Sequence, residues 1–252
     1  MTKSPTAPSH GTLADILKKM RKTIIISILF LIINSCSAQK IEIKDANLKK
    51  AILELGIDKN NNGIFEEDEV NIVTKLKLDE KNISDLSGIE KFKNLTDLNL
   101  RKNNITDFSK LNDLLKLEEL VIGDNKNNEL LDLSKLKNLK GLYAFRIGLK
   151  EIKFGSENIK KLYLQNNLFT EFETQNFPDL FTLNLDSCKN LRKIDLSKNA
   201  KLVQLNILGT GIENLNIKEN IILKTMYIER KVKLEKNEKQ ENLKPATVIR
   251  SN

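Results

Sequence analysis

The stretch LTDLNLRKNNI, residues 95–105, indicates the fold because its pattern recurs along the chain. Segments of the same pattern begin at residues 73, 117, 139, 159, 180, 202 and 223, in steps of 20 to 22 residues. Within 95–105, Leu98 and Leu100 alternate with polar residues, so in a strand the leucines face one side and the polar side chains the other. One such coil cannot bury its leucines alone, and the sequence therefore predicts stacked coils with a parallel sheet.

Each unit approximates L-x-x-L-x-L-x-x-N/C-x-L, and this pattern resembles the leucine-rich repeat family over residues 73–233. Early units continue as ISDLSGIEKFKN, which looks like the repeats of internalins, and later ones carry DLSKNAKL, which looks like repeats of bacterial surface lipoproteins. The resemblance implies an α/β fold. We expect a right-handed leucine-rich repeat solenoid, a horseshoe with the parallel sheet on its concave face and an N-terminal helix-loop cap.

A short polar residue follows the strand in most units, where it can satisfy backbone groups left open at the turn. These residues are Asn103, Asn125, Asn167, Cys188 and Thr210. Cys188 is interpreted as one member of this ladder, with a reactive thiol as the less favoured alternative because no histidine can activate it. Ile147 and Lys231 interrupt the pattern, so we expect local irregularity at both and fraying at Lys231.

The strand residues that miss the core should line an extended binding surface. An aromatic centre with a charged rim is typical of protein-binding hot spots. The predicted exposed patch consists of Val121, Tyr143, Phe145 and Tyr163, rimmed by Arg101, Glu119 and Lys161. The alternative is that these aromatic residues stack on one another without any ligand, since aromatic side chains suit strands generally.

The N-terminal segment reads as a secretory signal. Residues 20–38 have a basic start, a short apolar run and then small residues, and residues 1–19 form a polar upstream extension that the true start codon would exclude. INSC, ending at Cys36, resembles the lipobox of bacterial lipoproteins and predicts a lipid anchor on Cys36, and cleavage after Ala38 is the alternative. We therefore expect an exported protein at the outer membrane or cell surface, or alternatively a periplasmic or secreted one.

Charge and composition argue against several functions. The chain carries a net charge of +8, but its basic residues are interleaved with acids, so no stripe for phosphates stands out and we predict no nucleic-acid partner. The single histidine, His10, precedes the signal. Histidine-based nucleophilic catalysis and histidine-ligated zinc are thereby excluded from the mature chain, and we predict that the protein is not an enzyme.

Residues 58–69, DKNNNGIFEEDE, satisfy the calcium-loop pattern and resemble an EF-hand loop. A hard cation needs about seven oxygen ligands, and Gly63 permits the sharp turn. The predicted Ca²⁺ ligands are Asp58, Asn60, Asn62, the Ile64 carbonyl, Glu66 and Glu69. The following helix is too short for a full EF-hand, the two asparagines predict weak affinity, and a plain Asn-rich turn is the alternative.

These patterns give a domain scheme. A helix from Asp45 with the loop forms a cap at 39–72, about eight repeats fill 73–233, and residues 234–252 are a charged, flexible tail. We expect a monomeric, lipid-anchored protein that binds a protein or other surface macromolecule, with structural Ca²⁺ in its cap. The alternative function is a structural cell-envelope scaffold or a regulatory, inhibitory subunit of an enzyme.

Overall fold

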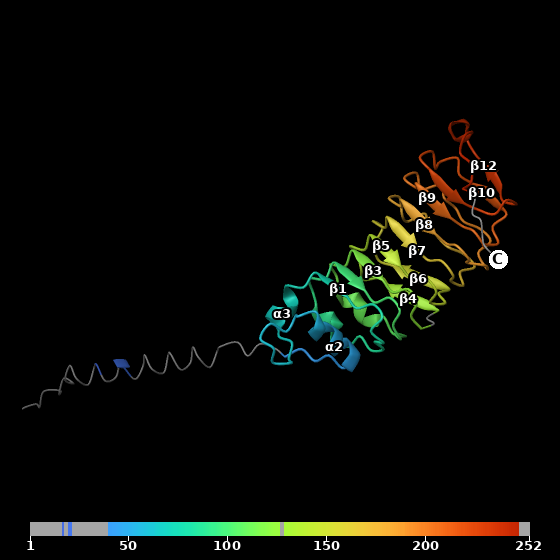
Figure 1. Ribbon diagram of the computed structural model, residues 1–252. Coiled ribbons are helices and arrows are strands. Elements are labelled where there is room, and N and C mark those ends of the chain that lie inside the picture. Colours follow the sequence, from blue (N-terminus) through green and yellow to red (C-terminus); the bar gives the residue numbers. More distant parts are fainter. Residues whose placement is uncertain (1–16, 18–19, 22–39, 127–128, 247–252) are drawn as a thin grey trace, which may run out of the picture. The chain divides into compact units, whose positions relative to one another are not determined.

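The leucine-rich units form the strands of one parallel sheet. In this computed structural model, which describes residues 17, 20–21, 40–126 and 129–246, every unit contributes one three-residue strand. The strands lie in the order β1 (Lys75–Lys77), β2 (Asp97–Asn99), β3 (Glu119–Val121), β5 (Gly141–Tyr143), β7 (Lys161–Tyr163), β8 (Thr182–Asn184), β9 (Gln204–Asn206) and β11 (Thr225–Tyr227). Figure 1 shows the coils stacked one on the next, each adding its strand to the sheet.

The strands pair in register, so equivalent leucines lie side by side. Leu76 pairs with Leu98, and Leu98 with Leu120, as expected if burial of the same face fixes the register. These side chains join a single hydrophobic cluster that runs the length of the repeats. The expected leucine-rich repeat solenoid with a parallel sheet is confirmed.

The polar ladder satisfies the backbone at the turn after each strand. Asn103 donates its amide to the carbonyls of Leu78 and Leu100, both at 2.8 Å, and accepts from the N–H groups of Lys81 and Ile83, both at 3.0 Å. Asn125 and Asn167 each donate to two carbonyls in the same way, whereas Cys188 donates only to the carbonyl of Leu164 and Thr210 only to that of Ile207. Each asparagine thus joins two successive coils.

The irregularity expected at Ile147 is absent, and that expectation was wrong. The residue before the ladder position has a positive φ in seven units: Glu80, Lys102, Asp124, Arg146, Asn166, Ser187 and Gly209. The coil of Ile147 therefore keeps the same left-handed turn, while Ile147 itself is buried in the core. Asn167 of the next coil accepts from the N–H of Ile147 at 3.4 Å and donates to the carbonyl of Ala144, which completes the turn without a polar side chain at 147.

Fraying at Lys231 is likewise not observed. Val232 is buried, and the following residues form β12 (Lys233–Glu235) and the 3-10 helix η3 (Glu238–Gln240). Gln240 is buried and donates to the carbonyls of Ile217 and Asn220. Over 234–246 the structure therefore differs from the expected flexible tail, because backbone groups of the last coils require partners that this segment supplies.

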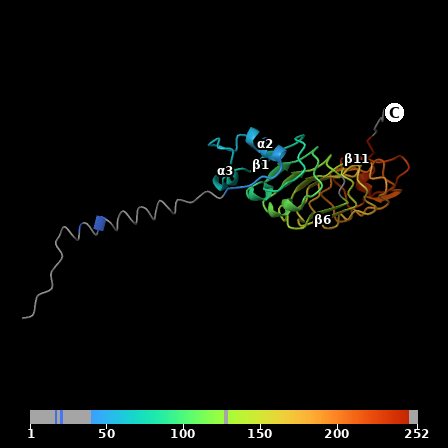
Figure 2. The same ribbon diagram turned by 90° about the horizontal axis from the view of Figure 1, so that it is seen from below.

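The return segments form a second surface, the back face, opposite the eight-stranded sheet. Two 3-10 helices, η1 (Ile89–Lys91) and η2 (Ser109–Asp113), occupy it in the first coils. Two separate pairs of strands follow: β4 (Leu130–Leu133) with β6 (Glu151–Phe154), and β10 (Asn214–Asn216) with β12. Viewed from below, β6 lies on the side away from β1 and β11 (Figure 2).

The helix-loop segment packs against the first coil. Helix α2 (Ala46–Glu54) buries Leu48, Ala51 and Ile52 in the same hydrophobic cluster as the repeats, and α3 (Glu67–Asn71) follows the loop. Asp45 caps α2 through the N–H groups of Asn47 and Leu48, and its other oxygen accepts from Ser84 and Asp85 of the first repeat. Among the described residues, no helix has the length and apolar character needed to cross a bilayer.

The ladder yields a test of stability. Replacing Asn103 with alanine should lower the free energy of unfolding by about 2 to 4 kcal/mol, because two carbonyls and two N–H groups lose their buried partner. The exposed neighbour Asn104 provides the control, since its alanine variant should change stability by less than about 0.5 kcal/mol. Chemical denaturation of both variants measures the difference, and equal stabilities would contradict this role for the ladder.

Candidate functional site

The predicted patch lies on the outward surface of the eight-stranded sheet, called the sheet face here. Register places Val121 beside Tyr143 and Tyr143 beside Tyr163, so the middle outward row brings these three residues together. Phe145 follows β5 on the same coil as Tyr143. Their side chains are half-buried rather than fully exposed, because neighbouring side chains of the same face cover them.

Tyr143 and Tyr163 form a parallel stack. Their ring centroids are 4.8 Å apart and the ring planes differ by 6°. Stacking covers one face of each ring, which is the arrangement expected if aromatic residues only stabilise the sheet. Tyr143 also bonds the Glu119 side chain, and burial, with further contributions from Glu119 and Tyr163, raises the pKa of Tyr143 to about 12.

Phe145 anchors a cluster of charges that the sequence did not reveal. The guanidinium carbons of Arg146 and Arg101 lie 4.8 and 5.8 Å from its ring centroid, and both arginines bond the carboxylate of Asp124. Hydrogen bonds from Arg146 and Arg101 hold the pKa of Asp124 below its usual value, against the opposing effect of burial. Two cations share one carboxylate, so the cluster keeps an excess positive charge beside the aromatic patch.

Glycine at position 123 makes room for this cluster. A Cβ at Gly123 would lie 2.5 Å from the Phe145 ring, so any larger residue would displace the ring. The spacing of Arg101, Asp124 and Arg146, one coil apart, is the sequence signal that would have predicted the cluster. Charged residues that recur at the repeat period lie on adjacent coils and can form ion pairs across them.

The predicted rim residues Lys161 and Glu119 face each other. The Lys161 ammonium lies 3.7 Å from a Glu119 oxygen, and the Glu119 side chain lies over Gly141, where a Cβ would clash with it. Glu119 therefore contacts both Lys161 and Tyr143. The rim is organised before any partner arrives.

An apolar hollow extends the patch toward the helix-loop segment. It has a volume of about 460 Å³ and lies between Leu55, Ile57 and Val73 and the first three strands, reaching Val121. Leu55 is 47% exposed there. Leu55 directly follows the last residue of α2 and stays accessible, whereas Leu48 and Ile52 within that helix are buried.

The predicted calcium ligands lie within one hydrogen-bonded loop. Asp58 accepts from the N–H groups of Asn62 and Gly63, and the Asn62 side-chain oxygen accepts from Ile64. The amide groups of Asn60 and Asn62 donate to Glu66. The side chains of the predicted ligands thus converge on one short turn.

Glu69, the last of the predicted ligands, bonds backbone groups of the same loop. Its oxygens accept from the N–H groups of Lys59, at 2.6 Å, and Glu66, at 3.1 Å, which completes a capping box for α3. Burial acts to raise the pKa of Glu69, but the hydrogen bonds outweigh it and the pKa is lowered. In the described part of the chain, no three Asp, Glu, His or Cys side chains are arranged for a metal ion, so Glu69 would have to share or release these bonds to bind one.

Cys188 does not have the character of a nucleophile. Its thiol is fully buried, donates to the carbonyl of Leu164 at 3.4 Å, and has its pKa raised to about 11 by burial. The ladder interpretation is confirmed. The predicted lipidation residue Cys36 and the signal segment lie outside the described residues.

Comparison with known proteins supports the fold. No protein-family model and no curated protein matches the sequence. The functional domain of InlJ from Listeria monocytogenes, which includes a cysteine ladder, aligns over 69% of this chain with 24% identity and a TM-score of 0.58. Internalin C2 from the same organism aligns over 73% with 21% identity and a TM-score of 0.53. The chain therefore has the leucine-rich repeat fold of internalins.

This chain covers different shares of the two internalin chains. It spans 41% of the InlJ chain and 93% of the internalin C2 chain. In the present chain the ladder contains cysteine only at Cys188 among the five ladder residues, and asparagine or threonine elsewhere.

The environment of Tyr143 predicts a pH dependence. Its folded pKa of about 12 lies above the value of about 10 expected in the unfolded chain, so the neutral phenol favours folding. This contribution is complete below pH 10 and should be lost as the pH rises through about 12. In spectrophotometric titration, the phenolate signal that appears at the highest pH should be absent in Tyr143→Phe. In Glu119→Gln the same signal should shift to lower pH. An unchanged titration in both variants would show that Tyr143 is not perturbed.

Proposed function

We propose that this chain is an exported protein that binds a macromolecular partner, most simply another protein, through the sheet face. The observation that carries the proposal is the half-exposed centre of Val121, Tyr143, Phe145 and Tyr163 beside a prearranged charged rim. Among the described residues, no helix or strand covers this surface. Binding would bury the apolar centre while Arg101 and Lys161 meet polar groups of the partner.

Preorganisation favours binding over a purely structural role for these residues. Arginine side chains normally lose rotamer freedom when they bind, but Arg101 and Arg146 are already held by Asp124 and Phe145. These side chains therefore lose less conformational entropy on association. The apolar hollow at Leu55 would receive an apolar side chain of the same partner.

Export and anchoring complete the proposal. The signal pattern at 20–38 and the lipobox-like INSC favour acylation of Cys36, which would hold the repeats at a membrane surface. Mass spectrometry of the mature N-terminus distinguishes acylated Cys36 from cleavage after Ala38. Protease accessibility on intact cells separates cell-surface exposure from a periplasmic location.

The patch can be tested by affinity capture. Substitution of Tyr143, Phe145 and Tyr163 by alanine should lower the affinity of the mature chain for its captured partner at least roughly a hundredfold. The reason is that buried aromatic anchors each contribute about 2 kcal/mol or more. Tyr227→Ala, at the far end of the same row, is the matched control and should leave affinity unchanged. Circular dichroism must be the same for both variants.

If the triple variant binds as tightly as the unchanged chain, the sheet-face patch is not the binding site. Failure to capture any partner from surface and periplasmic extracts would favour the alternative of a structural envelope scaffold. A partner whose own catalytic rate changes on binding would identify the protein as a regulatory subunit.

We further propose that the loop 58–69 binds calcium weakly and holds the helix-loop segment on the first coil. The support is the convergence of the Asp58, Asn62 and Glu66 side chains in one turn, tied to the chain before α2 by the bridge between Ile41 and Phe65. Asp58, Asn60, Asn62, Ile64, Glu66 and Glu69 would supply the oxygens. Competition with the capping box of Glu69 would keep the affinity low.

Calcium should raise the melting temperature of the unchanged chain, and a chelator should reverse the increase, because an ion that binds only the folded state stabilises it. Asp58→Ala should abolish the difference between the two conditions. Asp68→Ala, an exposed acid within the same loop pattern but outside the ligand positions, should retain it. A melting temperature insensitive to calcium and chelator would make the loop a plain turn.

A further inference from the structure

The back face is interrupted between its two strand pairs. The strands β4 and β6 pair with each other, as do β10 and β12, but residues 170–175 and 192–195 between them form no strand. In the part of the chain that the structure describes, the backbone N–H and C=O groups of residues 170–173 make no hydrogen bond. One edge of β6 and one edge of β10 are consequently open.

Two hollows occupy this interruption and share residues 171–173. One, of about 570 Å³, lies against β6, and the other, of about 1260 Å³, lies against β10. Glu171, Phe172 and Glu173 line both. The two hollows, with the segment 171–173 that borders both, are called the back groove here; residues 151–154, 170–175, 192–195 and 213–216 bound it.

The floor of the back groove is apolar and accessible. The inward residues Leu131 of β4 and Leu215 of β10 are each 1% exposed. At equivalent inward positions between them, Ile152, Phe172 and Ile194 are only half-buried. These three side chains pack against the core, and part of each is accessible to solvent along the groove.

The walls of the groove are acidic although the whole chain is basic. Seven acidic side chains line the hollows against four basic ones, while the chain carries a net charge of +8. The acids are Glu151, Glu157, Glu171, Glu173, Asp195, Glu213 and Glu235. Among the described residues, Glu171, Glu173 and Glu213 form no ion pair, so their charges are available to a partner.

We propose that the back groove binds an extended polypeptide segment of a partner in which apolar and basic side chains alternate. In an extended chain successive side chains point to opposite sides, so apolar residues would meet the floor at Phe172 while lysine or arginine residues meet Glu171 and Glu173. The unpaired backbone of 170–173 would bond the main chain of the segment.

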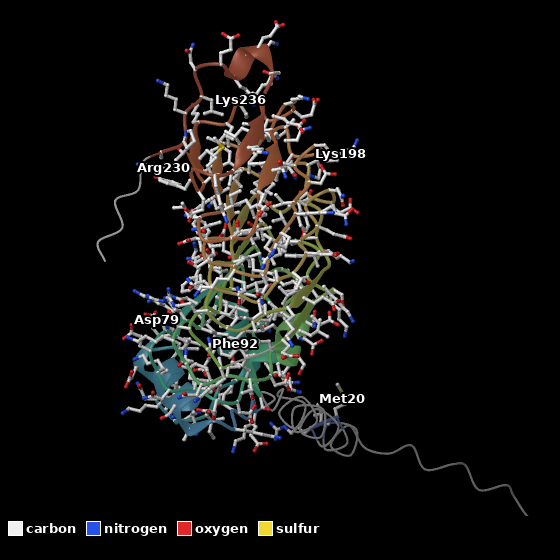
Figure 3. All side chains as sticks on the ribbon, turned by 90° about the vertical axis from the view of Figure 1, so that its right-hand side faces the viewer. Met20, Asp79, Phe92, Lys198, Arg230 and Lys236 are labelled. Carbon is white, nitrogen blue, oxygen red and sulfur yellow. The ribbon has the colours of Figure 1, made fainter. Side chains whose placement is uncertain are left out.

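The back groove and the sheet face are separate surfaces. Figure 3 shows Lys198, which follows the 192–195 segment, on the side opposite Asp79 and Arg230, which follow strands of the sheet. Occupation of the groove therefore does not depend on binding at the sheet face. One chain could hold two partners, or two parts of one partner.

The test uses the mature chain and a labelled peptide of alternating valine and lysine, with a valine and glutamate peptide as the charge-reversed probe. Fluorescence polarisation should detect binding of the lysine peptide only. Glu171→Gln combined with Glu173→Gln should weaken it roughly tenfold, because two charge pairs are lost. Glu67→Gln combined with Asp68→Asn, exposed acids of α3, is the matched control and should not change the affinity.

Hydrogen exchange and the sheet-face variant test independently where the peptide binds. Bound peptide should slow hydrogen exchange of the amides at 170–173, and alanine at Tyr143, Phe145 and Tyr163 should leave peptide affinity unchanged. Equal binding of both peptides, no loss in the Glu171 and Glu173 variant, or no protection at 170–173 would overturn the proposal. Because the sheet-face variant serves as a control, failure here is distinguishable from failure of the sheet-face function.

Discussion

No coil of this chain can bury its own leucines, and that constraint governs the molecule. A three-residue strand with one or two inward leucines leaves both of its edges and its apolar face unpaired. Only a neighbour in the same register can cover them, and Leu98 accordingly lies between Leu76 and Leu120. Before the first coil, the described chain forms α2, and its apolar face, with Leu48 and Ile52, joins the same cluster. At the other end β12 and η3 supply the last partners.

Stacking at a fixed period turns single residues into ladders. The left-handed turn before each ladder position opens backbone groups, and Asn103 closes them for two coils at once. The same periodicity brings Tyr143 over Tyr163 and aligns Arg101, Asp124 and Arg146 along the sheet face. A binding surface in such a solenoid is built from residues that are remote in sequence yet one coil apart in space. Strand pairing fixes the spacing of this surface, and contacts with Asp124 and Phe145 hold Arg146 in position before a partner arrives.

The two faces of the solenoid are constrained differently. In the eight-stranded sheet each strand pairs with its neighbours, and this pairing fixes the spacing of all outward rows. On the back face the return segments vary in length and conformation, from η1 to β4 to the strandless segment at 170–175. Pairing is lost there, and the inward residues Ile152, Phe172 and Ile194 remain partly accessible. The regular face and the irregular face therefore offer a partner different chemistry: preformed side-chain clusters on one and open backbone with an acidic wall on the other.

The features that depend on the repeat period alone could be predicted from the sequence. The recurrence of leucines identified the inward face, the strand positions and the ladder that includes Cys188, and it placed Val121, Tyr143 and Tyr163 in one row, because residues at equivalent repeat positions must become neighbours. Tertiary structure decided what depends on side-chain direction and on irregular segments. It decided the sharing of Asp124 by two arginines, the use of Glu69 as a helix cap, the intact turn at Ile147, the ordered segment after residue 233 and the back groove. A repeat fixes which coils are adjacent, but hydrogen bonds available from neighbouring coils decide how each exception is accommodated, and those partners are not local in the sequence.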